Sequence, residues 1–335
     1  MYSYKNKIGN NIIMKSQISI LKLVYPPISN QYAEWLSKDS KEIRDQLKDS
    51  NLYMIVQRAE AKFRFSEDSN EAMNKEKTIF KAKITIEDIV DDFQIDLDKL
   101  CEINKLDLNE YILSIEIGKK QIRFWKSDKV TMKPLDVIAW FTTEKILWDK
   151  WHKHPAITGL DKVELFSRFY LHYVGISKKD DSLTRLVVKP HDKRLRILSN
   201  EYNMSNKSRL TDEIILLFFK IEDLKFQTWE RGDNYLDFIE RMEVEKELVI
   251  ADAEKAFIKI LNSKYNAQKY ENYPKGKDGL YNQGFDGYGY LLGEPLTLIT
   301  NDAQIKGDVE EPSFYSKADS IIINGDEVKL FKSNN

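Results

Sequence analysis

The chain has 335 residues, of which 42% are hydrophobic and 32% are charged, with a formal net charge of −2 at pH 7. This length allows two domains. No stretch approaches the roughly 18 consecutive apolar residues that cross a bilayer, and the first residues lack the profile of a secretion signal. One cysteine, Cys101, excludes an intrachain disulfide, and we expect it to be a small buried residue. We therefore expect a cytoplasmic protein without a membrane partner.

The first half of the sequence predicts an α+β unit. Alternating apolar residues predict a strand at 17–25, and helical spacing predicts a helix at 30–49. Further strands are expected at 52–65, 78–86 and as a pair within 111–127, and further helices at 86–105 and 135–153, the second bounded by Pro134 and Pro155. We assign residues 1–154 to an N-terminal α+β domain that recognises a target or a partner.

The second half predicts a strand, two short helices, another strand and a longer helix. Their expected ranges are 166–176, 182–188, 191–200, 213–221 and 247–262, with a polar helical segment at 223–247. Six consecutive apolar residues, 214–219, favour a strand buried on both faces. Asn324-Gly325 between apolar alternations predicts a β-hairpin. We assign 155–300 to a second domain and 301–335 to a C-terminal β-hairpin extension.

The near-neutral net charge hides a basic region at 178–209. It contains nine Lys or Arg and four Asp or Glu. Such a region can attract phosphate groups, although a solvated face of mixed charge would give the same pattern.

Glu254 lies on the apolar side of the last predicted helix. At the helical period its direction is bracketed by Ile250, Phe257, Ile258 and Leu261. A carboxylate buried there requires a cation, because an unpaired buried charge is strongly unfavourable. The cation is either an Arg or Lys of a neighbouring element or a divalent metal ion of the kind used in phosphoryl chemistry.

Several residues in this half follow one another in a recognisable order. They are Tyr173-Val174-Gly175 at the end of a strand, Arg185 on the next short helix, His191, the strand 213–221, Glu254 and, twelve residues later, Asn266. This arrangement, over about residues 165–268, resembles the GIY-YIG nuclease family.

The resemblance implies a small central sheet flanked by helices and a hydrolytic site. By this resemblance Glu254 would hold one Mg²⁺ or Mn²⁺ ion, and a tyrosine oxygen would help to activate water. Arg185 would neutralise charge that grows on the phosphate, and His191 would assist proton transfer or hold a neighbouring phosphate.

One motif of the family is missing from its expected place. The strand before Tyr173 should carry Gly-Ile-Tyr, but the sequence there, "TGLDKVELFSR", has no tyrosine. Three explanations stay open: the first strand has diverged, Tyr170 or Tyr173 has taken over its role, or the catalytic tyrosine is absent and the domain only binds.

A second set of residues is expected to contact nucleic acid. Gly175 would let a phosphate approach the backbone, and the remaining candidates are Lys178, Lys193, Arg194, Arg196, Asn266, Lys275 and Lys277. The last two belong to 272–290, where aromatics alternate with glycines and lysines. That segment either stacks bases or forms a turn-rich excursion that packs on its own domain.

The leading hypothesis is therefore a metal-dependent endonuclease acting on DNA, with RNA left open, in phage defence, restriction or a mobile element. The alternative is a catalytically inactive nucleic-acid-binding module of the same fold. A third class is an interaction protein whose basic region meets an acidic partner.

Overall fold

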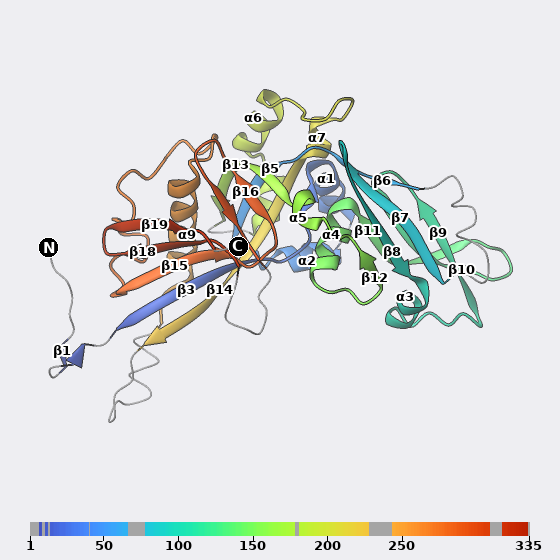
Figure 1. The fold of residues 1–335 in the computed structure, drawn as a ribbon, viewed down its shortest axis with the longest axis horizontal. Coiled ribbons are helices and arrows are strands. Elements are labelled where there is room, and N and C mark those ends of the chain that lie inside the picture. Colours follow the sequence, from blue (N-terminus) through green and yellow to red (C-terminus); the bar gives the residue numbers. More distant parts are fainter. Residues whose placement is uncertain are drawn as a thin grey trace.

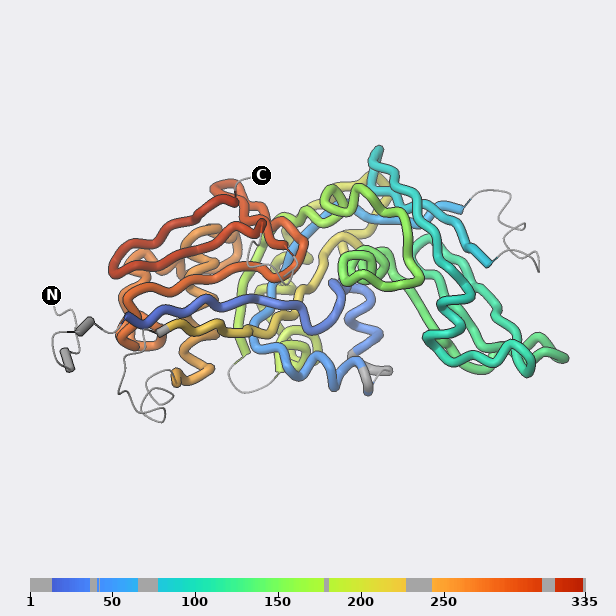
Figure 2. Tube along the Cα trace, turned by 60° about the horizontal axis from the view of Figure 1, so that its bottom comes forward, coloured from blue at the N-terminus to red at the C-terminus, as the bar shows by residue number. Residues whose placement is uncertain are grey.

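The computed structural model describes residues 7–8, 11–12, 14–39, 41–65, 78–177, 181–227, 243–308 and 317–333. It contains both helices and strands, so the expected α+β class is confirmed. The chain forms two units that lie side by side in an elongated molecule (Figures 1 and 2). None of the helices in these ranges is long and apolar enough to cross a membrane.

The first unit is built on a ten-stranded sheet. Its strands are β3 (Lys15–Leu23), β4 (Ile28–Ser29), β5 (Leu52–Gln57), β13 (Arg168–Ile176), β14 (Ile214–Gln227), β15 (Gly287–Leu292), β16 (Thr297–Ile299), β17 (Gln304–Lys306), β18 (Ser320–Asn324) and β19 (Glu327–Phe331). Their order is β17-β16-β13-β5-β14-β3-β15-β18-β19, and β4 also pairs with β14. Two short strands, β1 (Lys7–Ile8) and β2 (Asn11–Ile12), pair only with each other among the described residues.

Helices cover both faces of this sheet. They are α1 (Asn30–Asp39), α2 (Lys41–Leu47), a π-helical turn (Thr184–Val188), α6 (Asp192–Asn200), α7 (Leu210–Glu213) and α9 (Lys246–Leu261). Apolar residues of α9 form one core with the sheet, and residues of α1, α2, the π-helical turn and α6 form a second core on the other face. Residues 214–219 of β14 alternate between these two cores, which confirms the strand buried on both faces.

The second unit is inserted between β5 and β13. Its elements are β6 (Ala61–Arg64), β7 (Ile79–Ile86), β8 (Ile89–Asp96), α3 (Leu97–Ile103), β9 (Tyr111–Ile117), β10 (Gln121–Asp128), β11 (Pro134–Thr142), α4 (Thr143–Trp151), β12 (Ile157–Gly159) and α5 (Val163–Phe166). They form a three-stranded and a four-stranded sheet around a core of their own. In Figure 1 this inserted unit is the cyan-to-green part at the right.

The expected boundary at residue 154 does not follow this organisation. β3 and β5, which precede it, pair directly with β14, β13 and β15, which follow it. The C-terminal hairpin forms as expected, with Asn324 opposite Glu327, but it extends the same sheet through the pairing of β18 with β15. The inserted unit, at about 59–166, is the part that folds around a separate core.

Three predicted helices were wrong over part of their length. The segment expected to be helical at 86–105 begins with β8, where alternate residues Asp91, Phe93 and Ile95 are buried. The segment 135–153 begins with β11, and α4 starts only after Thr142 caps it by accepting from the Lys145 amide. Residues 223–227 continue β14, and 228–242 lie outside the described residues. Cys101 is buried, as expected.

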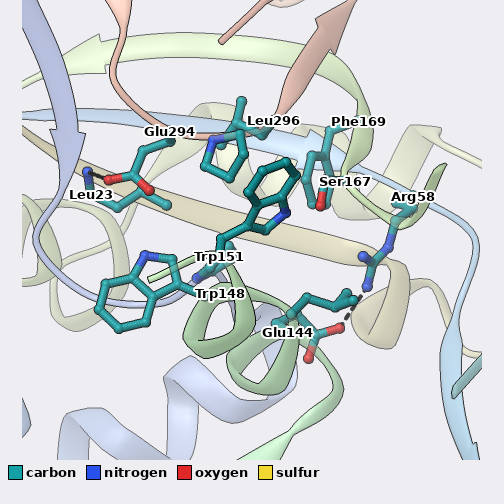
Figure 3. Close-up of a pocket in the computed structure, with 12 residues that line it drawn as sticks. Leu23, Arg58, Glu144, Trp148, Trp151, Ser167, Phe169, Glu294 and Leu296 are labelled. Carbon is teal, nitrogen blue, oxygen red and sulfur yellow. Dashed lines mark hydrogen bonds and ion pairs between the residues drawn. The ribbon is translucent and has the colours of Figure 1, made fainter. Parts of the chain in front are cut away.

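A buried ion pair holds the two units together where the chain crosses between them. Arg58 follows β5 directly, and its Nη2 lies 2.8 Å from Oε1 of Glu144 on α4 (Figure 3). Its Nη1 donates to the carbonyl oxygen of Phe166, close to the point where the chain returns. Because both charged side chains are less than a tenth exposed, removal of either one leaves a buried charge without its partner.

We expect Arg58→Ala to lower the free energy of unfolding by about 3–5 kcal/mol, because it leaves the Glu144 carboxylate uncompensated. The matched control is Arg123→Ala, which removes an exposed pair with Glu116 and should cost about 1 kcal/mol or less. Urea unfolding curves measure both. Equal losses for the two variants would show that the buried pair has no special role.

Candidate active site

Two tyrosines from adjacent strands lie side by side over a glycine. In the ladder between β5 and β13, Tyr53 is the partner of Gly175, and Tyr173 precedes that glycine by two residues. The two rings are 6.2 Å apart between centroids. A Cβ atom on Gly175 would lie 2.6 Å from Cε1 of Tyr173 and 2.8 Å from Cζ of Tyr53. Gly175 is thus inside the strand, and its missing side chain makes room for both rings rather than for a turn.

His191 connects this tyrosine pair to α6. Its Nε2 lies 2.9 Å from the hydroxyl oxygen of Tyr53, and its Nδ1 accepts from the backbone amide of Arg194 at the start of the helix. Burial, followed by the nearby charges of Arg185 and Arg194, lowers the pKa of His191 to about 4. The imidazole is therefore neutral at pH 7.

The hydrogen bonds define a direction for the protons. Because Nδ1 of neutral His191 accepts from an amide, its proton is on Nε2, which donates to the oxygen of Tyr53. Tyr173 is half-buried beside the buried Tyr53, so it is the more accessible of the two tyrosines.

Arg185 and Glu254 supply opposite charges beside the tyrosines. Burial raises the pKa of Tyr53 and of Tyr173, the Glu254 carboxylate raises both further, and the Arg185 guanidinium opposes the rise. Arg185 is exposed on the π-helical turn, and Glu254 is half-buried on α9. The structure therefore brings Tyr173, His191, Arg185 and Glu254 together with Tyr53.

Asn266 fixes the strand that carries this group. Its side-chain Oδ1 accepts from the Val174 amide at 2.9 Å, and its Nδ2 donates to the Val174 carbonyl at 2.8 Å. Ser263 donates to the same Oδ1 at 2.6 Å. With its side chain buried and fully bonded in this way, Asn266 ties the end of α9 to β13 instead of contacting nucleic acid.

Other predicted site residues lie outside the cluster. Tyr170 is 47% exposed and pairs with Gln57, four positions along the β5–β13 ladder from the pair of Tyr53 and Gly175. Arg194 is buried, and its guanidinium donates to Asn30, to Glu34 on α1 and to the Leu186 carbonyl, so it joins helices.

The remaining basic candidates are dispersed. Lys193 lies 3.9 Å from the Asp192 carboxylate, and Arg196 is exposed on α6. Lys275 pairs with Asp326 in the β18–β19 turn at 2.8 Å, and Lys277 is exposed. Lys178 lies outside the described residues.

The aromatic segment 272–290 packs on its own unit. Tyr273 and Tyr290 donate to Oδ1 of the fully buried Asp252 on α9, at 2.5 and 2.9 Å, and the Leu280 amide donates to its Oδ2. These tyrosines satisfy a buried carboxylate, so the turn-rich alternative describes this segment better than base stacking does.

Tyr53 is the residue that sequence reasoning missed. The first tyrosine was expected just before Tyr173, whereas the strand that pairs with β13 lies more than a hundred residues earlier, before the inserted unit. The available signal was a tyrosine in the apolar run "LYMIVQ" directly after a helical segment.

Glu254 is the candidate metal ligand of the cluster. Among the described residues, no group of three or more His, Cys, Asp or Glu side chains is arranged to hold a metal ion. A single half-buried carboxylate still fits Mg²⁺, which keeps several waters and commonly binds through one or two carboxylates together with substrate phosphates. Glu254 therefore fits an ion whose remaining ligands would be water and phosphate oxygens of the substrate.

The His191 imidazole should titrate near pH 4. Its folded-state pKa of about 4 lies below the ordinary 6.5, so the unfolded chain binds the proton more readily between these values. Its contribution to stability is complete above about pH 6.5 and is lost as the pH falls toward 4. NMR titration, with His191→Gln to assign the signal, measures this; a midpoint near 6.5 would contradict the buried neutral imidazole.

Gly175→Ala should destabilise the protein by about 1–3 kcal/mol, because the added methyl group overlaps both tyrosine rings. Gly287→Ala is the matched control in a strand of the same sheet, since its Cβ would meet only one backbone oxygen at 3.7 Å. Urea unfolding of both variants checks this. A loss at Gly175 no larger than that at Gly287 would mean that the rings do not depend on the missing side chain.

Comparisons with protein-family models, with curated proteins and with solved structures give no match for this chain. A functional assignment for the cluster therefore depends on its geometry.

Proposed function

We propose that the chain is a metal-dependent endonuclease that hydrolyses phosphodiester bonds of DNA at a GIY-YIG-like site. The observation that carries the proposal is the convergence of two tyrosine hydroxyls, a neutral histidine, an arginine and a carboxylate from five separate segments. These residues are Tyr53, Tyr173, His191, Arg185 and Glu254.

The strand order supports the family resemblance. In the proposed assignment Asn51-Leu52-Tyr53 stands in place of Gly-Ile-Tyr, and Tyr173-Val174-Gly175 is the second motif. β5 lies between β13 and β14, which gives the three-stranded centre that carries both motifs. The unit at 59–166 is an insertion between the two motif strands and is the candidate for target recognition.

Each side chain of the cluster has a role in the proposed hydrolysis. Water attacks phosphorus as the bond to the leaving sugar oxygen breaks; the proton that the water loses passes to bulk solvent, the leaving oxygen takes a proton from solvent, and the Tyr173 oxygen positions the attacking water. His191 donates from Nε2 to the oxygen of Tyr53 and so holds that hydroxyl in place. Arg185, which is exposed beside the tyrosines, neutralises negative charge that grows on the phosphate oxygens.

Glu254 would hold the Mg²⁺ or Mn²⁺ ion. When bound, such an ion polarises the phosphate and stabilises the leaving oxygen. Burial first, and the Glu254 carboxylate in addition, raise the pKa of both tyrosines in the free protein.

The inactive binding module is the weaker alternative. It was motivated by the absence of a first tyrosine, and Tyr53 now supplies a second hydroxyl beside Tyr173. DNA is the proposed substrate, with RNA as the other polymer of the same phosphodiester chemistry. A role in phage defence, restriction or a mobile element is part of the proposal.

We expect the purified chain to nick supercoiled plasmid in the presence of Mg²⁺ or Mn²⁺, and Glu254→Gln to lose this activity. Arg185→Ala should slow nicking by about 10²–10³-fold, since it removes a charge that stabilises the transition state. Glu327→Gln, a carboxylate change at an exposed position on the edge strand β19, is the matched control and should retain activity.

The assay separates the two functions. Nicking by wild type and Glu254→Gln at the same rate would mean that the cluster is not the site. No nicking on single-stranded, duplex or supercoiled DNA, together with salt-sensitive binding, would favour the inactive module.

A further inference from the structure

A groove lined with aromatic residues runs between the two units. Its larger part has a volume of about 590 Å³, and a neighbouring part of about 340 Å³ shares Tyr32, Trp35, Gln121 and Arg123 with it. The aromatic residues that line it are Tyr25, Tyr32, Trp35, Trp125, Trp140 and Trp148. Volumes in this range are typical of sites that enclose a ligand of moderate size.

The aromatic rings form a stacking surface with an open end. Tyr32 and Trp35 are stacked, with centroids 5.3 Å apart and planes inclined by 23°, and Trp140 lies 5.7 Å from Tyr32. Trp35 is nevertheless 47% exposed. An indole that is stacked on one side and half-exposed can accept another flat ring.

The wall of this groove also contains a buried polar group without a partner in the described part of the chain. Tyr25 lines the larger part and is only 6% exposed, yet its hydroxyl has no hydrogen-bond partner within the ranges that the structure describes. Buried polar groups are normally bonded. The side-chain amides of Gln46 and Gln121 also line the groove and could bond the edge of a heterocycle.

The charges along the groove suit an anion attached to that ring. Three cations line it: Arg123, Lys145, which pairs with Asp149, and Lys120, which pairs with Glu60. Its two carboxylates are engaged elsewhere, Glu144 with Arg58 and Asp212 with Arg209. Arg123 reaches its own partner, Glu116, only at 3.4 Å across an exposed surface, so a phosphate can compete for it.

The groove lies one helix away from the candidate active site. On α1, Asn30 and Glu34 accept from Arg194, three residues after His191, whereas Tyr32 and Trp35 point roughly 100° or more away around the same helix. α1, about 10–12 Å in diameter, thus lies between the groove and the Arg194 side chain of α6, the helix that His191 caps. A strand with one phosphate at the cluster can reach the groove within a few nucleotides.

We propose that this groove binds an unstacked base of the nucleic-acid strand whose backbone is cut at the cluster. The inference rests on the proposed function and adds to it that the substrate has a single-stranded or distorted region next to the cleavage position. Stacking of a base on an aromatic ring and contacts between phosphate and cations do not depend on which base is bound. The groove therefore selects a base that has left its stack, whatever the DNA sequence.

Fluorescence anisotropy of the full-length chain with labelled single-stranded DNA in EDTA tests this proposal without cleavage. One probe carries bases of mixed sequence, and a matched probe carries abasic sugar–phosphate in its central part. We expect Trp35→Ala to weaken binding of the first probe by about 5- to 100-fold, the range that one stacked base supplies, and to leave the abasic probe unchanged. Trp35→Phe should recover part of the loss.

Phe331→Ala is the matched control, because Phe331 is 51% exposed and lies on β19, away from the groove. Unchanged binding of the first probe by Trp35→Ala, or equal affinity of wild type for both probes, would overturn the groove as a base site. If free dAMP displaces the labelled strand at a dAMP concentration lower than that of the strand, the occupant is a mononucleotide, and this result would also overturn the proposal. If wild type binds neither probe nor plasmid, the proposed function fails as well.

Discussion

The candidate site depends on one pairing, that of Tyr53 on β5 with Gly175 on β13. A strand ladder places partners about 5 Å apart, and two tyrosine rings fit there only because Gly175 has no side chain. His191 then reaches the Tyr53 hydroxyl from the start of α6, while Asn266 bonds the buried backbone N–H and C=O of Val174 from beyond the end of α9. The proposed catalytic side chains and the structural side chains are therefore distinct within one motif.

The inserted unit interrupts this pairing in the sequence and leaves it intact in space. The chain leaves β5 at Arg58 and returns near Phe166, and the same guanidinium contacts the return point and Glu144. An insertion anchored by a buried ion pair is held in a fixed orientation, because a shift of one unit against the other would leave a buried charge without its partner. The aromatic groove lies along this junction, so both units contribute to it.

Local patterns in the sequence predicted much of the fold. The six apolar residues of β14, the Asn-Gly hairpin and the α9 helix follow from periodicity and turn chemistry, which depend on neighbours in the chain. The failures at β8 and β11 came from segments where apolar spacing suits a helix and tertiary pairing selects a strand.

The candidate site was predictable where its residues are close in sequence. Tyr173, Arg185 and His191 lie close together in the sequence, Glu254 was found from its place on the apolar side of a predicted helix, and the structure brings the four together. Tyr53 was not found because strands that pair can be far apart in the sequence, and the inserted unit separates Tyr53 from Tyr173 by more than a hundred residues. Arg194 was wrongly expected to contact phosphate. Its partners Asn30 and Glu34 are far away in the sequence, so the residues around Arg194 do not indicate that it is buried.

The most direct measurement is a double-mutant cycle on DNA cleavage with Tyr53→Phe, His191→Asn and the combined variant. If these side chains act as one unit with Tyr173, each single change slows cleavage and the double variant is little slower than the worse single one, with a coupling of about 0.5–3 kcal/mol. Independent multiplicative losses, or cleavage by Tyr53→Phe at the wild-type rate, would contradict the account.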